Sequence, residues 1–476
     1  MIKLFLLALS CFAITSLSAQ IKMDSTTASE DFDFMLNEFR QNFLSWNRYM
    51  DDKQLKSEIA DFKRKLSDVQ SDVDFYQDLR AFLAKMGHGH LSLNFSDKTL
   101  SKLGASRSYF PLMVRLMNNH LVITQNYGDK NEQIQDGLSI VSINGVKIDS
   151  ILAKLYPMVM IDGHIVSSKK AWIGGMNFSL LYRLAFGGAS LFTMEVEEFG
   201  ANEPHTVTIP AIRLKDFLFE NKKLKSVVDE SKKFKWKAIN DSVAYVCVPS
   251  FRDRNLDYAE FYKSTFKSID SMHIKYLIVD LQNNSLTEEG NENLLFGYLS
   301  SKTMHKYKQA MMLSRIYRKH LDNDLILSQR WATIDTIVYR GKNTLSTDYY
   351  SDYIYKKPQR RYIFGGHLYL LISGRTYAGA AEIASLMKHS KSATLVGEET
   401  GATFNGDMAG LMESFTLPNS KLVVKFPTTD FQLEVKPNKK GRGVLPDYDV
   451  SQTWSDYVQG KNSLEEFVLK LISKKK

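Results

Sequence analysis

The sequence of 476 residues lacks features that are typical of several classes of protein. It has only two cysteines, and one of them, Cys11, lies in an apolar N-terminal segment, so we expect no internal disulfide and a buried thiol at Cys247. With 10 prolines, 26 glycines and 44% hydrophobic residues, the sequence is not that of a collagen-like, low-complexity or disordered chain. The length instead predicts two or three folded domains with large cores.

Long apolar runs are also absent after the first 20 residues, so the mature chain is expected to have no integral membrane segment. Residues 4–17 are mostly apolar, follow Lys3 and lead into Ser18-Ala19-Gln20. A positive start, a short apolar stretch and a small-residue end are typical of a secretory signal peptide. We therefore expect residues 1–19 to be removed and the protein to be exported to the periplasm or the outside of the cell, free or associated with the envelope.

No charge of one sign dominates the chain. The 62 Lys and Arg residues exceed the 53 Asp and Glu residues by a formal charge of +9, and the two kinds are intermixed along the sequence. That distribution argues against a nucleic-acid interface, which would concentrate basic residues. The sequence also contains no phosphate-binding loop and no cofactor fingerprint, so we expect neither nucleic acid nor a cofactor as a ligand.

The hydrophobic periodicity changes twice along the chain. Apolar residues recur at helical spacing in three segments between residues 32 and 86, which predicts three packed amphipathic helices. Residues 109–212 carry short β-rich runs, and Asn144-Gly145 between two of them predicts a hairpin. Beyond these, strands alternate with helices, as in an α/β domain. The predicted strands are residues 243–248, 276–279, 368–372 and 393–396, followed by a hairpin from 415 to 426.

Three segments read together resemble one enzyme family: Leu371 to Glu382, Gly397 to Gly401 and Gly441 to Asp447. Their order and spacing resemble the tail-specific, or C-terminal processing, serine peptidases, in the branch whose core is similar to tricorn protease. Residues 135–145 also resemble the PDZ-type hairpin of such proteases. The resemblance implies a multidomain α/β fold: a helical domain at 20–100, a PDZ-like β domain at 101–215, and a peptidase-like core, similar to the crotonase fold, at 216–476.

In that family the nucleophilic serine lies where a core strand enters its helix. The matching position here is Ala378, or Gly379 if the alignment is counted back from Glu382. Neither side chain can attack a carbonyl group. The neighbouring serines that could replace it are Ser373 and Ser385.

The general base of the family is a histidine in a glycine-containing turn, and His90 in Gly87-His88-Gly89-His90 matches it. Two alternatives remain open for this pair of histidines: a turn without a catalytic role, or a metal-binding His-x-His pair. The carboxylate that would orient the base is not evident from the sequence; Glu399 and Glu434 are candidates.

The resemblance also implies an oxyanion hole made by the backbone N–H of Gly379 and by the turn at residues 282–287, where relatives have consecutive glycines. Ser285 and Leu286 in this turn, together with Gly374, are the expected substrate contacts. The Ser-Lys branch of the family is not supported, because residues 401–406 contain no lysine.

Three hypotheses follow, all with polypeptide partners. The leading one is an exported protein that binds polypeptide tails or unfolded segments with impaired hydrolysis. The alternative is an active serine endopeptidase, in which Ala378 is an engineered substitution or another serine acts. The third places the function in the PDZ-like region, which would accept a peptide by β-augmentation.

Overall fold

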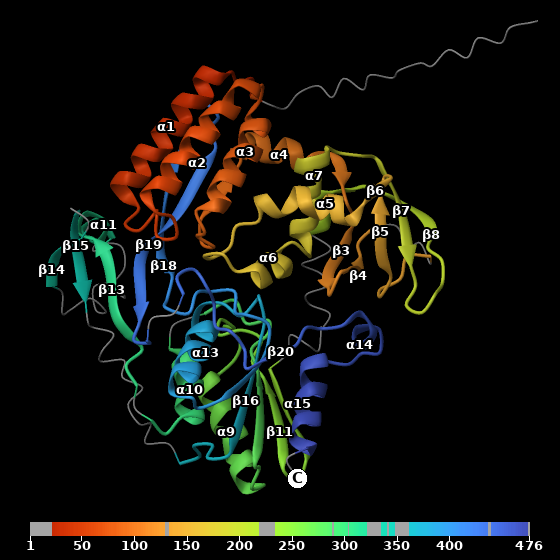
Figure 1. Ribbon diagram of the computed structural model, residues 1–476, viewed down its shortest axis with the longest axis vertical. Helices are drawn as coiled ribbons and strands as arrows, with labels where there is room; N and C mark the ends of the chain where they lie inside the picture. The colour runs from red at the N-terminus through yellow and green to blue at the C-terminus, as the bar shows by residue number, and fades with distance from the viewer. Residues whose placement is uncertain are drawn as a thin grey trace, which may run out of the picture.

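The computed structural model describes residues 21–128, 133–218, 234–287, 290–302, 304–320, 335–339, 342–347, 361–436 and 439–474. The expected signal peptide, residues 1–19, lies outside these ranges. Figure 1 shows a helical N-terminal region beside a β-rich region, with an α/β unit below both. Within the described ranges, no helix has the length and apolar character needed to cross a membrane.

The three predicted N-terminal helices are present. They are α1 (Ser25–Asn42), α2 (Asp52–Lys65) and α3 (Asp72–Lys85), and each begins after an Asp or Ser whose side chain accepts a backbone N–H of the first turn. A short strand, β1 (Ser92–Asn94), and α4 (Asp97–Ala105) follow. Buried residues of the first three helices share a core with Val424 and Phe426 near the other end of the chain.

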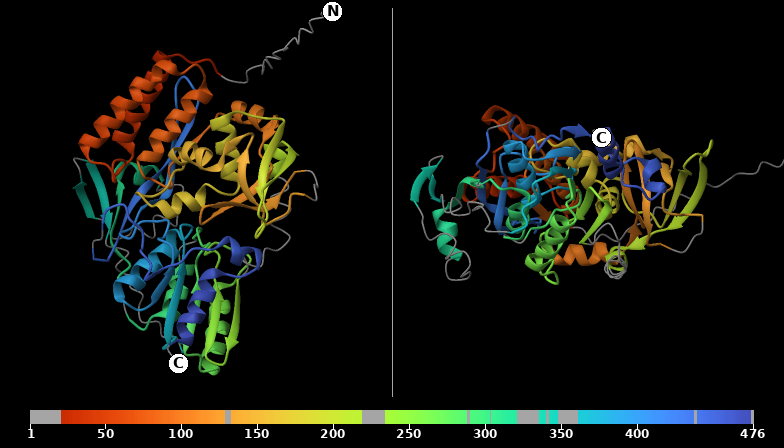
Figure 2. Two further views of the ribbon diagram at one scale, coloured as in Figure 1. Left: turned by 45° about the vertical axis from the view of Figure 1, so that its right-hand side comes forward. Right: turned by 90° about the horizontal axis from the view of Figure 1, so that it is seen from below.

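That shared core is built on a sheet that joins distant parts of the sequence. Strands β18 (Met408–Thr416) and β19 (Val423–Leu433) form the predicted hairpin, and β19 also pairs with β1. The remaining members are β13 (Tyr307–Leu313), β14 (Asp335–Tyr339) and β15 (Lys342–Thr347), in the order β1-β19-β13-β15-β14, and α11 (Ser314–His320) follows β13. The hairpin therefore lies beside the N-terminal helices in both Figure 1 and Figure 2. The division at residues 100 and 215 stays a prediction.

The middle region is an antiparallel sheet flanked by helices. Its strands are β3 (Leu112–Met117), β4 (His120–Asn126), β5 (Ser139–Ile143), β6 (Val146–Lys147), β7 (Leu191–Glu197) and β8 (His205–Pro210), in the order β3-β4-β5-β7-β8 with β6 paired to β5. Asn144 and Gly145 have φ values of 49° and 75°, which confirms the tight hairpin. The helices are α5 (Ile148–Leu155), α6 (Val166–Trp172) and α7 (Met176–Phe186), and a small pair, β2 (Arg107–Tyr109) and β9 (Ile212–Arg213), closes the region.

The α/β unit holds the predicted buried strands. Its sheet runs β10-β11-β12-β16-β17-β20, and all its pairings except β10 with β11 are parallel. The strands are β10 (Lys235–Asn240), β11 (Val243–Cys247), β12 (Tyr276–Asp280), β16 (His367–Ile372), β17 (Thr394–Gly397) and β20 (Tyr448–Asp449). Cys247 is buried in β11, as expected.

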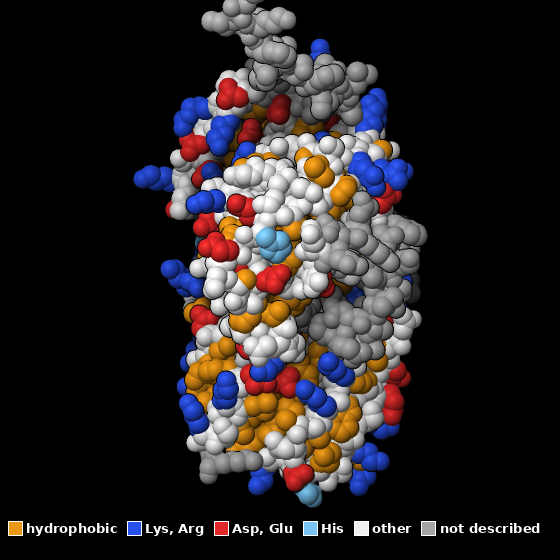
Figure 3. Space-filling view, turned by 90° about the vertical axis from the view of Figure 1, so that its right-hand side faces the viewer, with side chains coloured by type: hydrophobic (Ala, Val, Ile, Leu, Met, Phe, Trp, Pro, Cys, Tyr) orange, Lys and Arg blue, Asp and Glu red, His pale blue; other side chains and the backbone are white. Residues whose placement is uncertain are grey.

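Helices cover both faces of this parallel sheet, which explains its continuous apolar strands. Buried residues of α9 (Tyr258–Ser271), α10 (Asn291–Leu299) and α13 (Ala378–Ser390) share one core with the sheet, and α15 (Ser463–Ser473) packs in the other. The short α14 (Trp454–Val458) precedes α15. Figure 3 shows basic and acidic side chains interspersed over one face of the molecule, with apolar side chains gathered over its lower part.

Candidate functional site

The candidate site lies where the parallel strands β12 and β16 end. Ligands of open α/β sheets bind at the carboxyl ends of the strands, and here the middle region covers that edge. The Ser167 hydroxyl of α6 donates to the Glu399 carbonyl oxygen at 2.8 Å. Gly374, an expected substrate contact, is packed so closely on α6 that an added Cβ atom would lie 2.2 Å from the Ser167 carbonyl oxygen. Gly374 therefore packs against the protein's own backbone.

The backbone at Ala378 has the geometry of a strand-to-helix elbow. Ala378 is the first residue of α13 and has a φ of 47°, in the left-handed region that a residue with a Cβ seldom adopts. The turn is fixed by the Tyr377 N–H, which donates to the Asn284 carbonyl at 2.9 Å, and by the Gly401 N–H, which donates to the Thr376 carbonyl at 3.0 Å. Such strain is kept where a side chain must be presented at a site. The side chain presented here is a methyl group.

Neither neighbouring serine lies at the nucleophile position that the resemblance implies. The Ser373 hydroxyl donates to the Gln282 carbonyl at 2.5 Å, in the turn below the elbow. Ser385 has no exposed surface and is buried within α13. A nucleophile must reach a substrate carbonyl, and these hydroxyl groups do not face the surface of the site.

The N–H of Gly379, the expected oxyanion donor, is already occupied. It donates to the Thr287 hydroxyl oxygen at 2.9 Å. An added Cβ at Gly379 would lie 2.8 Å from Glu292 Cγ and 3.0 Å from Thr287 Cγ2, so only glycine fits. The sequence identified residues 282–287 as an altered turn but gave no sign that a side chain of this turn would cap the donor.

The rest of that turn divides into a buried and an exposed part. Asn284 is fully buried and its amide group donates to the Val248 carbonyl at 3.0 Å. Leu286 is 54% exposed, while its carbonyl accepts the Phe251 N–H at 2.8 Å. Ser285 is half-buried between them. The turn therefore offers a rigid backbone with one apolar side chain directed to solvent.

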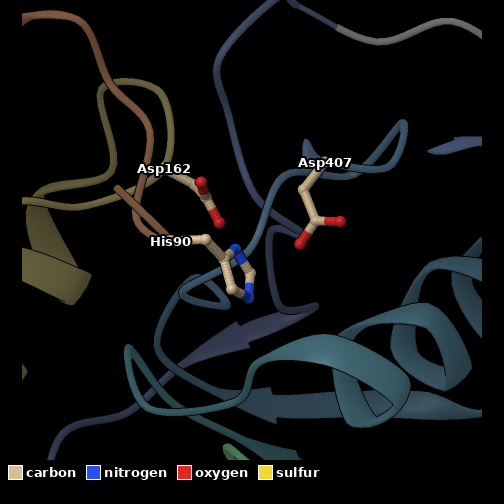
Figure 4. Close-up of side chains that lie close together, drawn as sticks. All are labelled: His90, Asp162 and Asp407. Atoms are coloured by element: carbon tan, nitrogen blue, oxygen red, sulfur yellow. The ribbon is translucent and has the colours of Figure 1, made fainter. Parts of the chain in front are cut away.

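His90 lies between two carboxylates, Asp162 and Asp407 (Figure 4). In that view one ring nitrogen faces Asp162 and the other points away from it. The Gly89 N–H donates to Asp162 Oδ1 at 2.8 Å. The charge of Asp162 acts on the hydroxyl of Tyr377, the residue just before Ala378. Burial, together with the charge of Asp407, raises the pKa of Asp162 to about 7.

The carboxylates beside His90 are not those suggested by the sequence. Glu399 accepts two hydrogen bonds from Arg442, each of 2.8 Å, and a third from the Gly443 N–H at 2.7 Å. Glu434 lines a separate cavity. Asp162 lies in the middle region and Asp407 just before β18, and no motif connects either of them with His90 in the sequence.

His88 is a structural residue of the helical region. It is 1% exposed, its Nε2 is 2.9 Å from the Trp46 carbonyl oxygen, and its ring contacts the rings of Phe43 and Tyr49. Burial lowers the pKa of His88 to about 3, so the ring is neutral at pH 7. The group of possible metal ligands around His90 does not include His88.

Stability should consequently fall in mild acid. The pKa of His88 is about 3 in the folded chain and near 6.5 when unfolded, so the unfolded state binds more protons between these values. We expect this residue to lower the free energy of unfolding by about 2 kcal/mol between pH 7 and pH 5. Urea unfolding at both pH values measures this loss in the protein and in His88→Gln. The contributions of the other titrating groups cancel in the difference between the two proteins. An equal loss in both proteins would contradict the assignment.

A buried ionic cluster supports the first turns of α13. Lys306 Nζ lies 2.8 Å from Glu292 Oε1 and 2.6 Å from Glu382 Oε2, and the Lys306 and Glu292 side chains are 1% and 0% exposed. The Tyr307 hydroxyl donates to Glu382 at 2.6 Å. The glutamate that follows the nucleophile position is thus part of the internal support of the helix.

Comparison with known proteins confirms the resemblance to the tail-specific serine peptidases. Residues 320–450 match Peptidase family S41. The crystal structure of mature CPAF is similar to this chain with a TM-score of 0.64 and 15% identity, over 94% of this chain and 98% of that one. The structure of mature CPAF complexed with lactacystin has a TM-score of 0.63 and 15% identity, over 94% and 97%. No curated protein matches the sequence. The multidomain α/β fold is therefore shared with mature CPAF at low identity.

Proposed function

We propose that this chain, which carries a Peptidase family S41 match on a peptidase fold, is an exported protein that binds unfolded polypeptide segments without hydrolysing them. The observation that carries the proposal is the hydrogen bond from the Gly379 N–H to the Thr287 hydroxyl, next to the methyl group of Ala378. The nucleophile and one oxyanion donor are both missing from the same site. Serine peptidase chemistry needs both.

The surface best suited to a polypeptide is the turn carrying Leu286. An exposed leucine on a backbone held by hydrogen bonds offers an apolar anchor at low entropic cost. Leu286 and the capped Gly379 N–H both belong to the edge where β12 and β16 end. We therefore place the bound segment along this edge.

One of the two edge strands of the middle region, β3, is less suited to accept a peptide. A peptide added to β3 would need its free backbone groups. The Gly175 N–H already donates to the Val114 carbonyl at 2.7 Å, and an added Cβ at Gly174 would lie 2.5 Å from the same oxygen. The connection between α6 and α7 thus covers the centre of β3. This contact argues against peptide addition at β3.

The experiment is a binding titration of the purified full chain against dye-labelled, reduced and carboxymethylated lactalbumin, read by fluorescence anisotropy. We expect Leu286→Asp to weaken binding about 10-fold, since an interface anchor is worth at least about 1.4 kcal/mol. Leu100→Asp is the matched control, because Leu100 is also exposed, at 46%, but lies on α4. Equal affinities of the two variants would contradict the placement.

A further inference from the structure

The cluster around His90 has the composition and spacing of a metal site. One ligand atom from each of His90, Asp162 and Asp407 lies within 4.8 Å of the other two. Asp162 is 1% exposed, and its Oδ2 has no hydrogen-bond partner among the described residues; the same holds for Nδ1 of His90. A buried carboxylate oxygen and an imidazole nitrogen that face one another without partners leave polar groups uncompensated.

The side chain of Arg48, which interacts electrostatically with the cluster, is hydrogen-bonded to other groups. Arg48 donates to the Asp430 carboxylate and, at 2.9 Å, to the Gly406 carbonyl oxygen. Its charge also acts on Asp162 and Asp407. Among the described residues, Asp162 and Asp407 form no salt bridge with a lysine or arginine, while Arg48 pairs with Asp430.

We propose that His90, Asp162 and Asp407 bind one divalent transition-metal ion, with Zn²⁺ as the preferred ion. One imidazole and two carboxylates provide three protein ligands, which leaves a fourth position of a tetrahedral Zn²⁺ ion open. Ligand atoms of such an ion are roughly 3.4 Å apart, given metal–ligand bonds of about 2.1 Å, so the ligand atoms must approach one another by up to about 1.4 Å to complete the site.

Backbone hydrogen bonds fix the positions of the three proposed ligands, as outer contacts do in metal sites. The Gly89 N–H binds Asp162 Oδ1 and so leaves Oδ2 free to face the ion. The Gly163 N–H donates to the Gly87 carbonyl at 2.8 Å and joins the loops that carry Asp162 and His90. The Asp407 carbonyl accepts the Phe431 N–H at 2.9 Å and so anchors the third ligand to β19. The ion would therefore join three segments that are distant from one another in the sequence.

The proposal is tested by titrating Zn²⁺ into the full chain after treatment with a chelator, using isothermal titration calorimetry. We expect one tight site and a rise in melting temperature with Zn²⁺. Asp162→Asn and Asp407→Asn keep the side-chain shapes and should each weaken this site at least about 100-fold. The matched control is His164→Ala, an exposed histidine close to Asp162 that should leave the affinity unchanged.

A second readout is independent of stability. Co²⁺ bound in place of Zn²⁺, with the His90 imidazole as a ligand, should give visible absorption bands. His90→Ala should remove these bands. The absence of a one-to-one site, or a site that persists in both asparagine variants, would overturn the proposal. Tighter binding of Mg²⁺ or Ca²⁺ than of Zn²⁺ would overturn the choice of ion. These outcomes do not depend on polypeptide binding, so they are separate from a failure of the proposed function.

Discussion

The variant Ala378→Ser is expected to cleave an unfolded polypeptide at least about 100-fold more slowly than the double variant Ala378→Ser with Thr287→Ala. The single variant supplies a hydroxyl at the elbow, but the Gly379 N–H still donates to Thr287. Loss of one oxyanion donor costs about 10²–10³ in turnover. Removing the Thr287 hydroxyl frees that donor. The rates are compared by gel-based proteolysis of carboxymethylated lactalbumin.

The matched control is Ala378→Ser with Thr287→Ser, which keeps a hydroxyl beside Gly379 and should remain slow. Fast cleavage by Ala378→Ser alone would show that the hydroxyl of Thr287 gives way to substrate. In that case the absent serine would be the whole defect, and an engineered or recent loss of the nucleophile would explain the sequence.

The second large effect is on stability. Lys306→Met should lower the free energy of unfolding by about 3–5 kcal/mol, because it leaves Glu292 and Glu382 buried without their cation. Burial already raises the pKa of Glu382. Urea unfolding at pH 7 measures the loss. Replacing all three residues, with Lys306→Met, Glu292→Gln and Glu382→Gln, should recover much of it, since no charge is then left unpaired.

An exposed ion pair provides the comparison for this prediction. Lys388 Nζ and Asp447 Oδ1 are 2.5 Å apart, with side chains 31% and 38% exposed. Lys388→Met should cost less than about 1 kcal/mol, because solvent screens the pair. If Lys306→Met cost no more than Lys388→Met, the buried cluster would not support α13 as described.

Local patterns predicted the local structure well. Helical spacing identified α1, α2 and α3, and Asn144-Gly145 identified its hairpin because both residues must adopt positive φ. Continuous apolar runs identified the parallel strands, because these strands are buried on both faces.

What the sequence did not reveal depends on contacts between distant segments. β1 and β19 pair although more than 300 residues separate them, and the partners of His90 come from two other regions of the chain. Glu399 looked like a catalytic carboxylate because it lies in a motif, but its lone pairs are taken by Arg442 and Gly443. Spacing along a chain carries little information about which carboxylate meets which histidine.

The most direct test of the central proposal is to incubate the purified mature chain with carboxymethylated lactalbumin for a day, at a concentration where anisotropy reports a complex. The mass of the polypeptide is then measured by mass spectrometry. The proposal predicts a bound polypeptide of unchanged mass. Fragments whose formation stops in His90→Ala would contradict it and establish an active peptidase.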